Sequence, residues 1–235
     1  LYYKYETHIH SCQGSACAID RAAEMALACL NQGYAGMVLT DHFVHGNTAV
    51  PRHMVWDCRM QLYYDAYLSA RAAVEGMDFT VLFGLEHSFG NGLEVLTYGI
   101  DLDFLLHKPD LPVLTPAAYG QRVREAGGLV IQAHPYRDRS YISKPGPLSP
   151  RDLDGVEVHN MGNRPEENRR ARQFAQAYPD LIPLAGSDAH AAGEAGRAGV
   201  AFPYPVRDAA QFVQALRRRD GLLIVDGEIE GGETM

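Results

Sequence analysis

Short apolar runs alternate with amphipathic segments along this sequence, and the alternation is its strongest structural constraint. The run "YYKYETHIH" (residues 2–10) is typical of a strand, and "AIDRAAEMALACLNQG" (18–33) is typical of a helix that ends near Gly33. The same order recurs further along the chain. Because repeated strand–helix units build parallel sheets covered by helices, the pattern predicts an α/β fold.

Later segments repeat this order, with one departure. Strands are predicted in "YAGMVLTDH", "GGLVIQAHPY", "GVEVHN", "LIPLAGSDAH", "GVAFP" and "GLLIVDG". Helices are predicted from Asp57 to about Gly76, and over residues 116–126, 165–177 and 207–219. The departure is "FTVLFGLEHSFGNGLEVLTYGI" (79–100), where Asn91-Gly92 predicts a hairpin of two antiparallel strands.

The chain has the size and apolar content of a single domain. It has 235 residues, of which 46% are hydrophobic, and it contains no internal repeat and no linker-like tract. We expect one domain over residues 1–226. The acidic, glycine-rich end "GEIEGGETM" (227–235) predicts a frayed tail.

Charge and cysteine content exclude several protein classes. A net charge of -8 argues against a protein that coats nucleic acid. No apolar run approaches the roughly 20 residues of a membrane span, and the first residues do not resemble a signal peptide. The four cysteines lack CxxC spacing, which favours reduced thiols. We therefore expect a soluble, cytoplasmic protein without a membrane partner.

Residues of the types that commonly bind metals lie at the ends of the predicted strands or directly after them. They are His8, His10, Asp41, His42, Glu86, His134, His159, Asp188 and His190. One such residue alone indicates little, since a histidine at a strand end is more often structural. Because the carboxyl ends of parallel strands converge, the joint pattern predicts one shared site.

The spacing within two of these motifs is informative. Side chains at i and i+2 of a strand face the same side, so His8 and His10 can reach one ion, as can Asp188 and His190. Imidazole and carboxylate ligands together suit Zn, Mn or Fe, and a carboxylate such as that of Glu86 can bridge two ions. We expect the other histidines, His45, His53, His87 and His107, to lie outside the site.

Six motifs together resemble one protein family. "HIH", "TDH", "GLEHS", "AHPYR", "EVHN" and "SDAH", in this order, resemble the PHP (polymerase and histidinol phosphatase) domain family from His8 to about Gly199. The resemblance implies a distorted (β/α)7 barrel with a di- or trinuclear metal site. It also implies phosphoesterase activity.

The resemblance further implies which residues bind which ion. A first ion takes His8, His10, Glu86 and Asp188; a second takes Glu86, His134 and His159; a third takes His42, His190 and one more ligand. Asp41 is expected to orient ligands rather than bind an ion. The sequence departs from the family where that additional ligand is expected, because the positions hold Ser15 and Ala16, with Cys17 and Asp20 nearby. The third ion is therefore expected to use Cys17 or water, to bind weakly, or to be absent.

The implied reaction is hydrolysis of a small-molecule or nucleotide phosphate ester by a metal-bridging hydroxide, with two or three divalent ions as cofactors. Arg137 and Arg197 are candidates for phosphate binding, and His190 or His42 for protonating the leaving group. Nucleic acid is expected as a substrate only in the form of short oligonucleotides. Trp56, Tyr136 and Tyr141 are candidates for stacking on a ring-bearing substrate.

Two alternatives remain open from the sequence. Amidohydrolases use similar His-x-His barrels, so hydrolysis of a C–N or C–O bond is one of them. The other is a degenerate, non-catalytic PHP module, which the incomplete third site favours. The sequence leaves open the physiological substrate and the oligomeric state.

Overall fold

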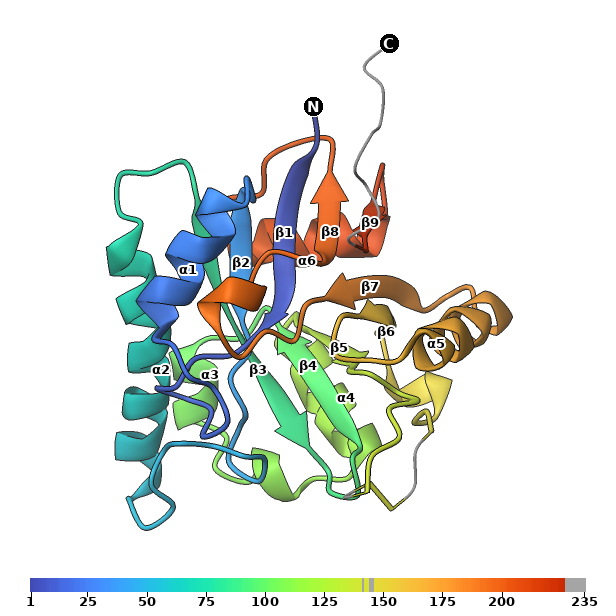
Figure 1. Ribbon diagram of the computed structural model, residues 1–235. Coiled ribbons are helices and arrows are strands. Elements are labelled where there is room, and N and C mark those ends of the chain that lie inside the picture. Colours follow the sequence, from blue (N-terminus) through green and yellow to red (C-terminus); the bar gives the residue numbers. More distant parts are fainter. Residues whose placement is uncertain (141, 144–145, 227–235) are drawn as a thin grey trace.

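A curved sheet surrounded by helices forms the molecule (Figure 1). The computed structural model describes residues 1–140, 142–143 and 146–226, so the predicted frayed tail and Tyr141 lie outside it. In this part of the chain nine strands follow the order β7-β6-β5-β4-β3-β2-β1-β8-β9. Their bounds are β1 Tyr3–Ile9, β2 Gly36–Leu39, β3 Thr80–Ser88, β4 Glu94–Tyr98, β5 Leu129–Gln132, β6 Gly155–Asn160, β7 Ile182–Gly186, β8 Gly199–Phe202 and β9 Leu223–Val225.

The sheet curls until β1 lies beside β7. The backbone amide of His10 donates to the carbonyl of Ala189 at 2.9 Å, and that of Asp188 donates to the carbonyl of His8 at 2.8 Å. These bonds nearly close the sheet, and the predicted distorted barrel is confirmed. The distortion comes largely from β4, which pairs antiparallel with both β3 and β5.

The predicted hairpin joins β3 to β4. Asn91 (φ 56°) and Gly92 (φ 79°) both adopt left-handed backbone, the conformation for which an Asn-Gly pair is suited. Ser88, at the end of β3, is paired with Glu94, the first residue of β4. An antiparallel β4 therefore brings its amino end to the edge at which the neighbouring parallel strands finish.

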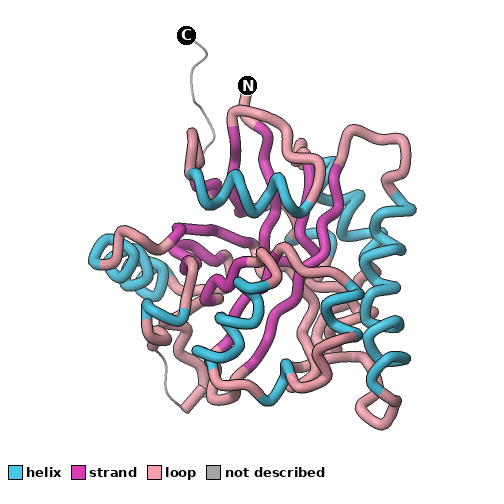
Figure 2. Tube along the Cα trace, turned by 180° about the vertical axis from the view of Figure 1, so that it is seen from behind, coloured by secondary structure: helices cyan, strands magenta, loops and turns pink. Residues whose placement is uncertain are grey.

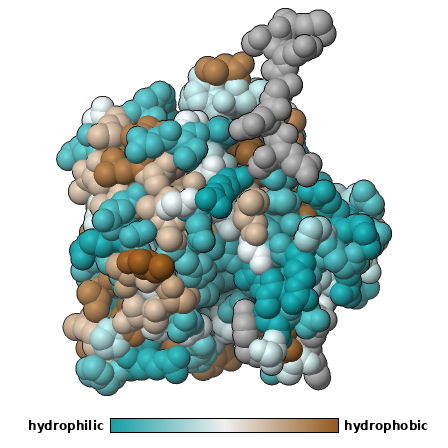
Figure 3. Space-filling view, viewed as in Figure 1, coloured by the Kyte–Doolittle hydropathy of each residue, from teal (hydrophilic) through white to brown (hydrophobic). Residues whose placement is uncertain are grey.

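Helices cover the outside of the barrel. They are α1 Ala22–Asn31, α2 Trp56–Ala73, α3 Leu102–Leu106, α4 Pro116–Glu125, α5 Pro165–Ala177 and α6 Ala209–Arg218. Seen from behind, α6 crosses the strands near the two termini (Figure 2). Over α5 the surface is mainly hydrophilic (Figure 3). No helix in the described residues is both long and apolar enough to cross a membrane.

Apolar and polar residues occupy opposite ends of β1. Near its start, Tyr5 packs against Phe202 and Phe212 in an apolar cluster that includes α6. Near its end, His8 and His10 are fully buried among polar groups. The apolar end stabilises the barrel by burial, which leaves the other end available for chemistry.

Candidate metal centre

Four side chains form what we call the inner cluster: His8, His10, Glu86 and Asp188. As the alternation along β1 predicts, His8 and His10 point to the same side, with their Nε2 atoms 3.1 Å apart. Asp188 Oδ1 lies 3.1 Å from Nε2 of His10 and 3.4 Å from Nε2 of His8. All four side chains are at most 5% exposed.

Glu86 lies between three histidines. Its Oε1 is 3.3 Å from His8 Nε2 and 3.0 Å from His134 Nε2, while its Oε2 is 2.8 Å from His42 Nδ1. The two oxygens thus face different groups of potential ligands. This is the arrangement expected of a carboxylate that bridges two cations.

Strained backbone places two of these side chains. His134 (φ 27°) and Asp188 (φ 55°) both have positive φ, which is uncommon for residues other than glycine. The predicted i and i+2 strand geometry of Asp188 and His190 is wrong, because β7 ends at Gly186. Left-handed backbone at Asp188 nonetheless directs its carboxylate toward His10. Such strain often marks a functional site.

Buried polar groups hold the inner histidines in position. His8 Nδ1 lies 2.9 Å from Oε1 of Glu157, and His10 Nδ1 lies 3.0 Å from Oγ of Ser15. Ser15 in turn donates to Asp41 Oδ1 at 2.8 Å. Asp41 thus orients Ser15, which in turn orients His10. Burial raises the pKa of the Asp41 carboxyl group to about 6. With Nδ1 of each ring engaged, Nε2 is the atom directed at the cluster.

Arg137 lies against the inner cluster. Its Nη2 atom is 2.7 Å from Asp188 Oδ2 and donates to Asn160 Oδ1 at 2.7 Å, while its Nε donates to Asn163 Oδ1 at 2.9 Å. Burial alone would raise the pKa of Asp188, but the charges of His8 and Arg137 hold it well below its usual range. The guanidinium is a fixed positive charge beside the candidate ligands.

Arg197 does not share this location. It is exposed, and its Nη2 donates to the carbonyl of Gly193 at 2.7 Å. None of its described contacts reaches the inner cluster. The two arginines that the sequence offered as candidates for phosphate binding are therefore in different environments.

His159 is also away from the cluster. The pairing of β6 with β7 shifts register between Glu157 and His159, so the two side chains no longer face the same side. Glu157 faces His8, whereas the ring of His159 lies near Asn168 and Arg172 of α5, at 3.3 and 3.2 Å. The structure thus does not bring His159 to the second-ion ligands with which it was grouped.

Glu94 lies near the ligands expected for the second ion, and the sequence interpretation did not include it. Its Oε2 is 3.6 Å from His134 Nε2, and it groups with His42 and Glu86 as a potential ligand set. The signal was available, because the predicted hairpin places Glu94 opposite Ser88, on the face that carries Glu86. Glu157 was also missed, since its role depends on the bulge in β6.

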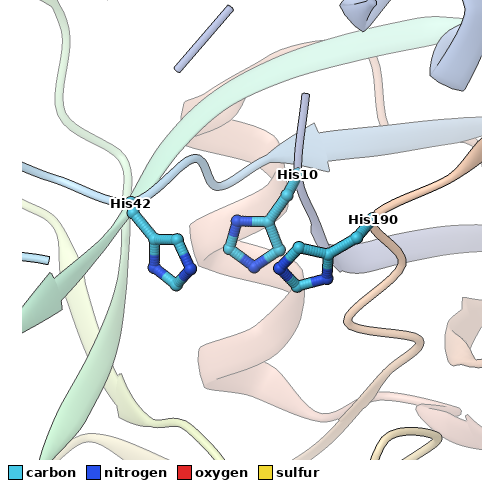
Figure 4. A group of neighbouring side chains, drawn as sticks. All are labelled: His10, His42 and His190. Carbon is cyan, nitrogen blue, oxygen red and sulfur yellow. The ribbon is translucent and has the colours of Figure 1, made fainter. Parts of the chain in front are cut away.

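A second group, which we call the outer cluster, consists of His42 and His190, which together with His10 form a potential ligand group. In Figure 4 the rings of His42 and His190 converge on the same space as that of His10. His190 stacks on His10 with ring centroids 4.4 Å apart. Asp20 lies elsewhere, because its Oδ2 accepts a hydrogen bond from the backbone amide of Ala192 at 2.7 Å. Cys17, the other nearby candidate for the missing ligand, is exposed and is in none of the potential ligand groups of the described residues.

The donor set fits divalent cations. Buried atoms without a hydrogen-bond partner in the described residues include Glu86 Oε2, His42 Nδ1 and His134 Nδ1. Glu86 Oε2 and His42 Nδ1 form an ion pair at 2.8 Å although they make no regular hydrogen bond, and a bound cation would satisfy both atoms. The potential ligand groups are His8/His10/Asp188, His8/Glu86/His134, His42/Glu86/Glu94 and His10/His42/His190.

Trp56 and Tyr136, the two stacking candidates among the described residues, contact other parts of the fold. Trp56 Nε1 donates to the carbonyl of Leu105 at 2.8 Å, and Tyr136 lies under the guanidinium of Arg170 at 4.4 Å. As expected, His87 points away from the site: its buried ring stacks on Tyr119 with centroids 4.6 Å apart. The other three histidines expected outside the site, His45, His53 and His107, are exposed.

Comparison with known proteins supports the family resemblance. Residues 165–220 match a family model described as PHP-associated. No curated protein matches the sequence significantly.

Several solved structures share the fold. A two-domain Bacteroides vulgatus protein, containing a predicted PHP-like metal-dependent phosphoesterase, has a TM-score of 0.68 at 14% identity; the match covers 96% of this chain and 65% of that one. The lesion-specific endonuclease Q of Pyrococcus furiosus has a TM-score of 0.64 at 13% identity, covering 95% and 58%. An amidohydrolase from Chromobacterium violaceum has a TM-score of 0.54 at 15% identity, covering 94% and 98%.

This chain therefore spans less than two thirds of the length of the first two proteins. Identities this low establish a common fold and leave activity to be argued from the site. Together with the match over residues 165–220, the shared fold confirms the resemblance of this chain to the PHP domain family.

Proposed function

We propose that the protein is a metal-dependent hydrolase of small-molecule or nucleotide phosphate esters. The observation that carries the proposal is the position of Glu86, whose oxygens lie between His8 and His134 on one side and His42 on the other. Arg137 supplies a fixed positive charge beside the same group.

The ligands divide between two principal ions. The inner cluster would hold the first, and His134 and Glu94 would hold a second with Glu86 as a shared ligand. Here Glu94 takes the role that the family resemblance gave to His159. When bound, divalent ions lower the pKa of water and neutralise charge on phosphoryl oxygens, which removes the need for a protein nucleophile.

Arg137 favours a phosphate ester over an amide. Its side chain is 13% exposed and is fixed by Asp188, Asn160 and Asn163, so little rotamer freedom remains to be lost when an anion binds. Guanidinium groups suit phosphoryl oxygens, whereas a neutral amide gains little from such a charge. The fold does not separate the two reactions, because an amidohydrolase also shares it.

The proton for the leaving group would come from the exposed side of the site. His190 is 28% exposed, and its Nδ1 is 2.8 Å from the carbonyl oxygen of Asp188, so its Nε2 is the atom left to contact a substrate or an ion. Proton donation and metal binding compete for that one atom.

The substrate class is limited by charge. An endonuclease shares the fold, so a nucleic acid substrate agrees with the architecture. A net charge of -8 provides no general attraction for a long duplex. We therefore propose phosphomonoesters, phosphodiesters and short oligonucleotides as substrates.

A substrate panel tests the proposal. Metal-free protein reloaded with Mn²⁺ or Zn²⁺ is assayed on an aryl phosphomonoester, a diaryl phosphodiester, a short oligonucleotide, an aryl amide and a lactone. We expect turnover of at least one phosphorus ester, loss of that turnover with a chelator, and competitive inhibition by inorganic phosphate. Turnover confined to the amide or lactone, without inhibition by phosphate, would contradict it. Absence of metal binding would favour a non-catalytic module.

A further inference from the structure

We infer that Glu6, two residues before His8 on β1, is a positioning residue that fixes His8 and Asp188 relative to each other through their backbone. The inference rests on the proposed metal centre and concerns a carboxyl group that is not itself a ligand. Glu6 is fully buried and is in none of the potential ligand groups of the described residues. Its part in the site follows from the backbone amides whose hydrogen bonds it accepts.

A bulge in β1 creates the need for such an acceptor. Between the register positions of Glu6 and Ile9, β1 contains two residues where β2 contains one. The ladder is disrupted at a bulge, so a buried amide there needs another acceptor. Oε1 of Glu6 accepts from both bulge residues, at 3.0 Å from Thr7 N and 3.2 Å from His8 N. The carboxyl group thereby fixes the backbone from which the His8 side chain projects.

The same oxygen reaches across to the segment that carries Asp188. Ser187 follows β7 and directly precedes Asp188, and its backbone amide donates to Glu6 Oε1 at 3.0 Å. The next amide, that of Asp188, donates to the carbonyl of His8 at 2.8 Å. The strands approach so closely here that a side chain at Gly186 would clash with His8. One carboxyl oxygen therefore links the backbone of two inner ligands at the junction of β1 and β7.

This linkage predicts a specific loss of metal affinity when the acceptor is removed. Three buried amides would lose their partner, and the backbone at His8 and at Asp188 could then shift independently. In the proposed centre, both residues are ligands of the first ion and neither is a ligand of the second. One equivalent of metal should therefore bind more weakly, while the other keeps its affinity.

Zinc titration of matched variants tests the assignment without relying on activity. Metal-free protein is titrated with Zn²⁺ in competition with a chromophoric chelator, and thermal unfolding is recorded on the same samples. Glu6→Met removes the acceptor and keeps most of the volume, so the affinity of one equivalent should fall about tenfold or more. Glu6→Gln keeps an oxygen that can accept, so its affinity should stay within about threefold of the wild type.

The matched control is Thr7→Val, which acts on the same junction of strands. The Thr7 hydroxyl donates to the carbonyl of Ala185 at 2.6 Å, so the variant loses a buried bond between β1 and β7 but keeps every amide that Glu6 accepts. We expect a lower melting temperature, with zinc affinity within about twofold of the wild type. A purely structural role of Glu6 would make Glu6→Met behave like this control.

Hydrogen exchange of the wild-type protein gives a readout that needs no variant. The amides of His8 and Ser187 should exchange as slowly as that of Asp188, within about tenfold, and Zn²⁺ should slow all three together. Rapid exchange at His8 and Ser187 would overturn the inference, even if Glu6→Met does not fold.

The outcomes separate the two proposals. Wild-type protein that binds zinc, together with a Glu6→Met variant of equal affinity, would overturn the role of Glu6 and leave the metal centre intact. Failure of the folded wild type to bind zinc would overturn both.

Discussion

The inner and outer clusters lie side by side, with the rings of His10 and His190 stacked, but they are built differently. In the inner cluster, His8, His10 and Asp188 are each fixed by a polar partner: Glu157, Ser15 and Arg137 respectively. In the outer cluster, His42 is 12% and His190 is 28% exposed. The inner ligands are therefore preorganised by the barrel, whereas the outer ligands depend on loops.

This difference shows which features of the ligand geometry the fold itself provides. Side chains at the ends of packed strands have little freedom, so their ligand geometry is fixed before a cation binds. Loop residues can change with less effect on stability, which makes the outer cluster the place where this chain can depart from its relatives. Substitutions in the inner cluster should therefore have larger effects than substitutions in the outer one.

The largest effect is expected for Asp188→Asn. This change removes a carboxylate that faces both inner histidines, and a lost metal contact removes several kcal/mol of charge stabilisation, so kcat/KM should fall by about three orders of magnitude. Steady-state hydrolysis of an aryl phosphate, with circular dichroism to verify folding, measures this. A folded variant with nearly normal kcat/KM would place the ion elsewhere.

A smaller effect is expected for Glu157→Gln. The side chain keeps its shape but loses the charge that faces Nδ1 of His8, and loss of such a partner lowers metal affinity about 10-fold to 100-fold. Metal titration of the variant measures the change. Glu24→Gln, an exposed helix position, is the control. Equal affinity in the two variants would show that Glu157 does not position His8.

The two arginines should then differ. Arg137→Ala removes a guanidinium next to the site and should raise KM for a phosphate ester about tenfold, with Arg137→Lys intermediate because the charge remains. Arg197→Ala should change KM by no more than about twofold, since surface substitutions usually have small effects. Equal effects of the two alanine substitutions would contradict the assignment of the phosphate to Arg137.

The smallest effect is expected for His159→Ala. The ring faces α5, so metal stoichiometry should stay unchanged and kcat/KM should stay within about twofold of the wild type. Elemental analysis after dialysis measures the stoichiometry. Loss of one equivalent of metal would restore the ligand role that the family resemblance implied.

The contrast between His8 and His159 explains how far the sequence could predict the site. Strict alternation along β1 placed His8 and His10 on one face, and the structure agrees. The same rule failed in β6 because a bulge turned His159 outward, and a bulge is decided by pairing with β7.

The same limit applies to the fold. The alternation of strands and helices predicted the barrel, and the Asn-Gly pair predicted the hairpin. To predict the position of Glu94 from the sequence, the hairpin has to be combined with its strand register. The left-handed backbone at Asp188 arises from contacts with β1, which no local sequence pattern encodes.

The most direct test of the central claim is a crystal structure of the metal-loaded protein grown with phosphate, with anomalous scattering to identify the ions. The account predicts one ion bound by His8, His10, Glu86 and Asp188, a second sharing Glu86 with His134, and phosphate within hydrogen-bond distance of Arg137. Ions bound elsewhere, or an inner cluster without any ion in fully folded protein, would contradict it.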